Sequence, residues 1–109
     1  MGKKGVIAKL SPIEKKAFDA VKSALSKYVK PKRLKPIRNE QDNYFSIKLD
    51  GKDGLEVCFI RLNEDGSLKD IGFPRFIYKV SSSDEILSHK DKLLYKLIDM
   101  ASRNNIIIP

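Results

Sequence analysis

The clearest structural signal lies in residues 44–62, which read YFSIKLDGKDGLEVCFIRL. Phe45, Ile47 and Leu49 alternate with other side chains, and this period of two is typical of a strand with one buried face. A glycine-rich turn follows, and the second strand contains the run Val57–Ile60, which is apolar on both faces. Such a run is typical of a central strand that is at least partly covered on both sides. The stretch therefore predicts two strands joined by a tight turn.

More strands are expected further along the chain. Asn63–Gly66 is a hairpin signal because glycine readily adopts the positive φ of such a turn. A third strand is expected at Leu68–Ile71, where the following Gly72–Pro74 segment either breaks or bulges it. The strand pattern resumes at Arg75–Val80 with apolar side chains on one side. The chain therefore predicts three or four antiparallel strands.

Two amphipathic helices flank these strands in the sequence. Ser11–Glu14 forms a capping box with proline at the first helical position, and it predicts a helix from Pro12 to about Val29. Ser82–Glu85 repeats the spacing before a second helix, for which Asn104 is a left-handed C-cap candidate. The expected apolar stripes comprise Ile13, Ala17, Val21, Ala24, Leu25 and Tyr28, then Ile86, Leu93, Leu94, Leu97, Ile98 and Ala101.

This order of elements predicts an α+β fold. The simplest architecture is a two-layer sandwich, helix – three or four antiparallel strands – helix, with both helices on one face of the sheet. We assign residues 11–104 to a single domain and residues 1–10 to a basic tail or short strand. The apolar tail at 105–109 adds an edge strand, docks on its own domain or contacts another chain. The second face of the sheet is either solvated or a binding surface.

The composition excludes several classes of function. Among 109 residues, no apolar run has the length of a membrane span or a signal-peptide core, which predicts a soluble, cytoplasmic protein. One cysteine, Cys58, excludes an internal disulfide and a cysteine-based zinc site. We expect Cys58 to be a buried thiol and His89, the single histidine, to be structural. No nucleophile, base or metal constellation is evident, so neither an enzyme nor a cofactor is predicted.

The net charge of +8 is unevenly distributed. Residues 1–38 hold twelve basic and two acidic side chains, whereas the remaining residues carry a net charge of −2. Such asymmetry is typical of a polyanion contact, and the alternative is a solvated basic helix face with a basic tail. The densest basic segment is Lys30–Arg38, whose two prolines predict an extended loop or an edge strand.

The candidate nucleic-acid-binding residues are of two kinds. The first are phosphate ligands in the basic third of the chain, namely Lys3, Lys4, Lys30, Lys32, Arg33, Lys35 and Arg38. The second are Tyr44 and Tyr78, which on an exposed sheet face beside Arg61 or Arg75 would stack on bases. The alternative is that both tyrosines are half-buried sheet residues. Whether the nucleic acid is DNA or RNA is left open.

A series of short motifs extends from Glu14 to Ala101. They are Glu14…Ala17…Val21-Lys22…Leu25, Arg38…Asp42…Tyr44-Phe45-Ser46-Ile47, Val57-Cys58…Arg61-Leu62-Asn63, Lys69-Asp70-Ile71 and Tyr78…Ser81…Asp84-Glu85-Ile86. Together they resemble an accessory module of bacterial and archaeal proteins related to type I restriction enzyme R subunits or restriction endonuclease-like proteins. In that family the module follows a nuclease-like domain, so the resemblance implies a DNA-associated context such as restriction, defence or mobile elements.

The resemblance carries no catalytic residues over to this chain. The nuclease-like half is missing, and the nearest match to a PD-(D/E)xK site is Asp50 with Glu56-Val57-Cys58, where cysteine replaces the lysine. The helix–three strands–helix order is also similar, by analogy, to a double-stranded RNA-binding domain. The lysine cluster of that domain corresponds here to Ser88–Lys92, which follows the acids Asp84 and Glu85.

Two functions are therefore expected as alternatives. The first is a small nonenzymatic nucleic-acid-binding or accessory module that contacts phosphates through its basic N-terminal third. The second is a protein-interaction or regulatory module, including a homodimer, that uses a sheet edge and the apolar tail. In the second case the basic segment would contact an acidic protein surface.

Overall fold

The structure is a computed structural model that describes residues 6, 7, 9–38, 44–50, 54–73 and 75–105. Within these residues the chain forms one antiparallel sheet of six strands and a set of α-helices. In chain order the elements are β1 (Val6–Ile7), α1 (Pro12–Leu25), the 3₁₀ helix η1 (Pro31–Arg33), β2 (Leu34–Arg38), β3 (Tyr44–Leu49), β4 (Leu55–Leu62), β5 (Leu68–Phe73), β6 (Phe76–Lys79), α2 (Ser83–Leu87) and α3 (Lys90–Arg103).

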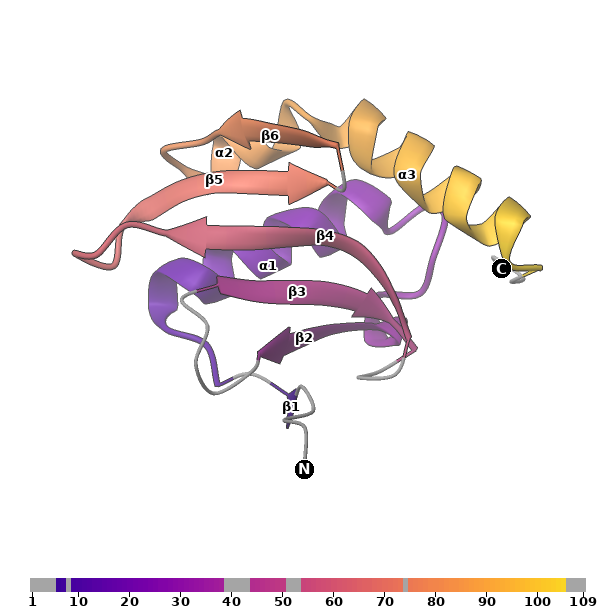
Figure 1. Ribbon diagram of the computed structural model, residues 1–109, viewed down its shortest axis with the longest axis horizontal. Helices are drawn as coiled ribbons and strands as arrows, with labels where there is room; N and C mark the ends of the chain where they lie inside the picture. The colour runs from indigo at the N-terminus through magenta and orange to yellow at the C-terminus, as the bar shows by residue number, and fades with distance from the viewer. Residues whose placement is uncertain (1–5, 8, 39–43, 51–53, 74, 106–109) are drawn as a thin grey trace.

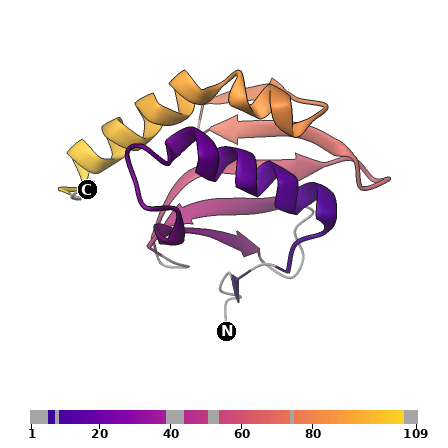
Figure 2. The same ribbon diagram turned by 180° about the vertical axis from the view of Figure 1, so that it is seen from behind.

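The strands lie in the sheet in the same order as in the chain, and every neighbouring pair is antiparallel. Figure 1 shows the sheet from the side without helices, and Figure 2 shows the α-helices together on the opposite face. The predicted α+β two-layer sandwich is therefore confirmed. The sheet gains β1 and β2, so residues 1–10 do contain a short strand and Lys30–Arg38 is part 3₁₀ helix and part strand.

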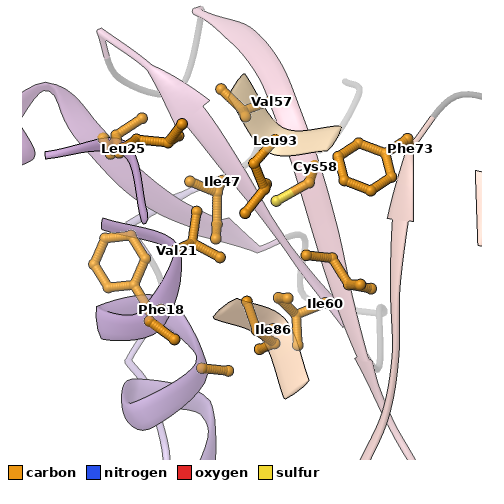
Figure 3. Packing of buried hydrophobic residues seen from close by; sticks show 14 of the residues in the cluster. Phe18, Val21, Leu25, Ile47, Val57, Cys58, Ile60, Phe73, Ile86 and Leu93 are labelled. Atoms are coloured by element: carbon orange, nitrogen blue, oxygen red, sulfur yellow. The ribbon is translucent and has the colours of Figure 1, made fainter. Parts of the chain in front are cut away.

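The core lies between the helices and one face of the sheet. Figure 3 shows side chains of α1, including Phe18 and Val21, packed against Ile47 of β3 and Ile60 of β4. The register of β4 shifts next to Val57, so that one extra residue is accommodated opposite β3. Val57 and Cys58 are consequently both in the core, which explains the apolar run predicted to be covered on both faces.

Helix α1 begins as predicted and ends earlier than predicted. The Ser11 side chain accepts a hydrogen bond from the Glu14 backbone N–H at 3.2 Å, and the Glu14 carboxylate accepts one from the Ser11 N–H at 3.0 Å. The helix ends at Leu25 rather than near Val29. Ile13, which was expected in the buried stripe, is 44% exposed. Glu14 is buried instead, and its carboxylate forms an ion pair with Arg38 of β2.

The C-terminal helix is divided where one continuous helix was predicted. The Ser82 side chain caps α2 by accepting the Glu85 N–H at 3.4 Å, and α3 begins after His89. Ile86 of α2 is buried in the core, whereas Ile98 of α3, which was expected in the buried stripe, is 52% exposed. Asn104 caps α3 with a negative φ; the left-handed conformation is adopted by Asn105 instead.

Candidate nucleic-acid interface

The side of the sheet without helices, here called the open face, carries side chains from β2 to β6 (Figure 1). The strand register aligns these side chains in three rows that cross the strands. The first row is Lys35, Lys48 and Glu56; the second is Ile37, Ser46, Phe59, Gly72 and Ile77; the third is Tyr44, Arg61, Asp70 and Lys79.

An aromatic pair occupies the centre of the open face. The rings of Tyr44 on β3 and Phe59 on β4 have centroids 5.6 Å apart and are tilted by 57°. Both residues are half-buried, so each ring keeps an accessible surface. The Phe59 ring lies over Gly72 of β5, where a Cβ atom would come within 2.1 Å of the ring carbon Cζ. The ring occupies the space in which a side chain at Gly72 would lie. β5 ends at Phe73 and β6 begins at Phe76, so the strand is interrupted within the predicted segment, after Gly72.

Arg61 lies beside Tyr44 on the open face, but its charge is already compensated. Its Nε and Nη2 atoms each donate a hydrogen bond of 2.8 Å to the carboxylate of Asp70 on β5, which is only 3% exposed. These bonds raise the pKa of Arg61. A bidentate pair holds the guanidinium plane in place and favours stacking over phosphate binding.

Lysines lie at both edges of the open face. Lys35 on β2 is directly opposite Lys48 on β3, and Lys79 on β6 is opposite Asp70 on β5. Glu56 is the acidic member of the Lys35 row, and its carboxylate accepts a hydrogen bond from the Ser46 hydroxyl. The outer lysines therefore present positive charge on either side of the aromatic pair.

Two other predicted phosphate ligands form ion pairs away from the open face. Arg33 donates hydrogen bonds of 2.8 Å from Nε and Nη2 to Asp50, which raise the pKa of Arg33 and lower the pKa of Asp50. Arg38 forms an ion pair with the buried carboxylate of Glu14 and so connects β2 to the start of α1. Both arginines act as structural links between segments distant in the sequence.

The remaining predicted residues are divided between two other locations. Lys30 and Lys32 are exposed at η1, just before Lys35 in the chain. Tyr78 belongs to the helix side of β6, where it stacks on His89 with centroids 4.7 Å apart, and Arg75 lines a groove on that side. Lys3 and Lys4 lie outside the described residues. The candidates that the structure describes therefore do not converge on one face, and among them only Lys35, Tyr44 and Arg61 share the open face.

Three residues of the open face are not among the candidates predicted from the sequence, namely Phe59, Lys48 and Lys79. The alternation of β3 contained a signal for Lys48, because it lies two and four residues from Ser46 and Tyr44 on the same face. Phe59 lies in an apolar run whose two faces the sequence does not distinguish, and its pairing with Ser46 places it on the open face. Lys79 became a candidate only when the register of β6 against β5 was known.

Cys58 has the environment expected of a structural residue. It is buried in the core, and desolvation raises the pKa of its thiol, so the thiolate needed for nucleophilic chemistry is disfavoured. Within the described ranges, no cluster of three His, Cys, Asp or Glu side chains is placed to hold a metal ion. No helix in the described part of the chain is long and apolar enough to cross a bilayer.

Comparisons of the chain with protein-family models, with curated proteins and with solved structures find no match. The resemblance to the restriction-related module thus stays a prediction from the short motifs. The site has to be interpreted from its own geometry, which is that of an antiparallel sheet with a central aromatic pair and lysines at its edges.

Proposed function

We propose that this protein is a nonenzymatic nucleic-acid-binding module that uses the open face of its sheet. The observation that carries the proposal is the Tyr44–Phe59 pair at the centre of a helix-free sheet face, with lysines toward both edges. Aromatic rings on such a surface stack on bases, and flanking lysines bind the backbone phosphates. Stacking requires bases that are not paired in a duplex, so the expected ligand is single-stranded DNA or RNA.

The charge of the molecule supports the same proposal. The net charge of +8 attracts a polyanion from a distance, and the Arg61–Asp70 pair adds no net charge to the centre of the open face. Lys30 and Lys32 of η1 precede Lys35 in the chain and extend the positive surface beyond the sheet. A DNA-associated role in restriction, defence or mobile elements, as the resemblance implies, is consistent with this ligand class.

The test removes two lysines from the open face. Lys35→Gln with Lys48→Gln should weaken binding to a labelled single strand by on the order of tenfold. It should also make the slope of the logarithm of the binding constant against the logarithm of the salt concentration shallower by about 1.4, because fewer counterions are released when two phosphate contacts are lost. The measurement is fluorescence anisotropy across a salt series with single-stranded and duplex DNA and RNA. The matched control is Lys16→Gln with Lys27→Gln, which removes the same charge from exposed positions on the helix side.

A second arm of the same test separates stacking from charge. Tyr44→Leu should reduce the affinity at every salt concentration without changing the salt slope, whereas Tyr28→Leu, at an exposed position at the end of α1, should have no effect. Equal losses in the two lysine pairs would show diffuse attraction rather than a site. Absence of binding to all of the nucleic-acid probes would overturn the proposal.

A further inference from the structure

β6 forms one edge of the sheet, and apolar side chains on it are exposed. Phe76 is 60% exposed and Ile77 is 52% exposed, and β6 has no further strand on its outer side within the described residues. The Val80 N–H donates to the Lys69 carbonyl at 3.1 Å. In an antiparallel ladder the bonded positions alternate, so the main-chain groups of Ile77 and Lys79 point away from β5. This edge therefore offers unpaired donors and acceptors to an added strand.

A groove of about 570 Å³ lies on the helix side of this edge, between β6 and α3. Its walls include the aromatic rings of Phe76 and Tyr78 from β6 and of Tyr95 from α3, which is largely exposed. Side chains on one face of a strand added to β6 would enter this groove, because alternate residues of a strand point to the same face.

The groove and the edge are positively charged. Arg75, Lys92 and Lys96 line the groove, and Lys79 lies on the open side of the same strand. Of the two acids in the lining, Asp99 is already paired with Arg103 at 3.0 Å, which leaves Asp91 against these cations. The Lys92 ammonium lies 5.2 Å from the centroid of the Tyr78 ring, so cation and aromatic surface are presented together.

We propose that β6 binds an extended acidic segment of a partner protein as an additional strand. Main-chain hydrogen bonds to Ile77 and Lys79 would hold the segment, its apolar side chains would contact Phe76 and Tyr95, and its carboxylates would pair with the cations of the groove. This site is separate from the open-face lysines at β2 and β3, and it does not depend on the proposed nucleic-acid binding.

A second copy of the chain fits this edge less well than an acidic peptide. In a two-fold antiparallel pairing of β6 with β6, each copy would bring the same cations, Arg75 and Lys79, to the shared edge. Positive charge would then meet positive charge across the two strands, which is destabilising. The same two cations would instead attract an acidic strand.

The main-chain contact can be removed without disturbing the ladder to β5. In Ile77→Pro the missing N–H is one that points outward, and proline is tolerated in an edge strand at such a position. Ile77→Val is the matched control because it keeps the N–H and the β-branched side chain. Circular dichroism and thermal unfolding of both variants would establish that the fold is retained.

The experiment uses a synthetic peptide in which glutamate alternates with valine, and a second peptide in which lysine replaces the glutamate. The acidic peptide should bind to the full chain, the lysine peptide should not, and Ile77→Pro should weaken binding by on the order of tenfold while Ile77→Val leaves it unchanged. Should Ile77→Pro fail to fold, Lys92→Glu with Lys96→Glu tests the same site by charge reversal and should abolish binding of the acidic peptide.

Several outcomes would overturn the inference. If the folded Ile77→Pro variant binds as well as the unmodified chain, no added strand is formed. If neither the variants nor the unmodified chain bind the acidic peptide, the proposed acidic partner is wrong. The same conclusion follows if light scattering shows a dimer that Ile77→Pro dissociates, because the edge would then bind a second copy of the chain. The inference would also fail if a single-stranded oligonucleotide lost its binding in the variant with Lys92→Glu and Lys96→Glu but kept it in Ile77→Pro. In that case the groove would bind nucleic acid and not an added strand.

Discussion

A Cβ atom at Gly72 would lie 2.1 Å from Cζ and 2.3 Å from Cε2 of the Phe59 ring, so this glycine is required by a side chain on the neighbouring strand. Three arginines show the same dependence on a distant partner. Arg33, Arg38 and Arg61 were grouped as ligands of a polyanion, yet each forms an ion pair with an acid that lies elsewhere in the sequence. At the scale of the residue, these three guanidinium groups are therefore already paired with acids of the protein itself.

We expect Gly72→Ala to lower the free energy of unfolding by roughly 1–2 kcal/mol, because the Phe59 ring must leave its position over β5. In a Phe59→Leu background the same substitution should cost much less, since the clash is with the ring. Urea unfolding of the four variants in this double-mutant cycle measures the coupling. An equal cost of Gly72→Ala in both backgrounds would show that the ring is not the cause.

At the scale of the element, the start of α1 is tied to the sheet. Glu14 accepts a hydrogen bond from the Ser11 N–H at 3.0 Å and also forms the ion pair with Arg38 of β2. The capping box was predicted from the sequence, whereas its link to β2 was not. This one carboxylate thus serves both the helix terminus and the packing of α1 on the sheet.

The two halves of the capping box should therefore differ in their effect on stability. Ser11→Ala should cost about 1 kcal/mol, the usual value for a lost N-cap. Glu14→Ala should cost more, roughly 2–3 kcal/mol, because it leaves Arg38 without its buried partner, and Glu14→Gln should lie between them. Thermal and urea unfolding give the order. A Ser11→Ala variant that is as destabilised as Glu14→Ala would contradict this role of Arg38.

At the scale of the whole molecule, the two proposed surfaces lie on different parts of one sheet. The open-face lysines Lys35 and Lys48 are on β2 and β3, whereas the peptide edge is β6, on the far side of the sheet (Figure 1). The helices cover the opposite face and leave both surfaces accessible (Figure 2). This separation predicts that the surfaces act independently, except near Lys79, which lies on the open face of β6.

Independence can be measured directly with the variants already described. Ile77→Pro should change the affinity for a single-stranded oligonucleotide by no more than about twofold, and Lys35→Gln with Lys48→Gln should change the affinity for the acidic peptide equally little, as expected for distant sites. Calorimetric titration of each ligand in the presence of the other provides a third measurement. Strong competition between peptide and oligonucleotide would show that they share one surface.

Much of the fold could be predicted from local patterns. The alternation in β3, the capping box at Ser11 and the N-cap at Ser82 depend on residues that are close in sequence, and the structure confirms them. At Ser82 the predicted capping box is incomplete, and the Glu85 carboxylate accepts a hydrogen bond from the Ser81 hydroxyl instead. The break between α2 and α3 could not be predicted because Ser88 and His89 do not prevent a helix by themselves. In the structure Ile86 of α2 and Leu93 of α3 both belong to the one hydrophobic core.

The sequence by itself determined the α+β sandwich, the starts of α1 and α2 and the excess of positive charge, since these follow from spacing and composition. The tertiary structure alone decided which cations remain available to a ligand. The ion-pair partners lie between 9 and 24 residues away along the chain, and they are brought together only by the strand register and the packing of α1 on the sheet. The same register, in which Ser46 lies opposite Phe59 and Tyr44 opposite Arg61, placed the Phe59 ring beside Tyr44 and created the aromatic centre of the open face.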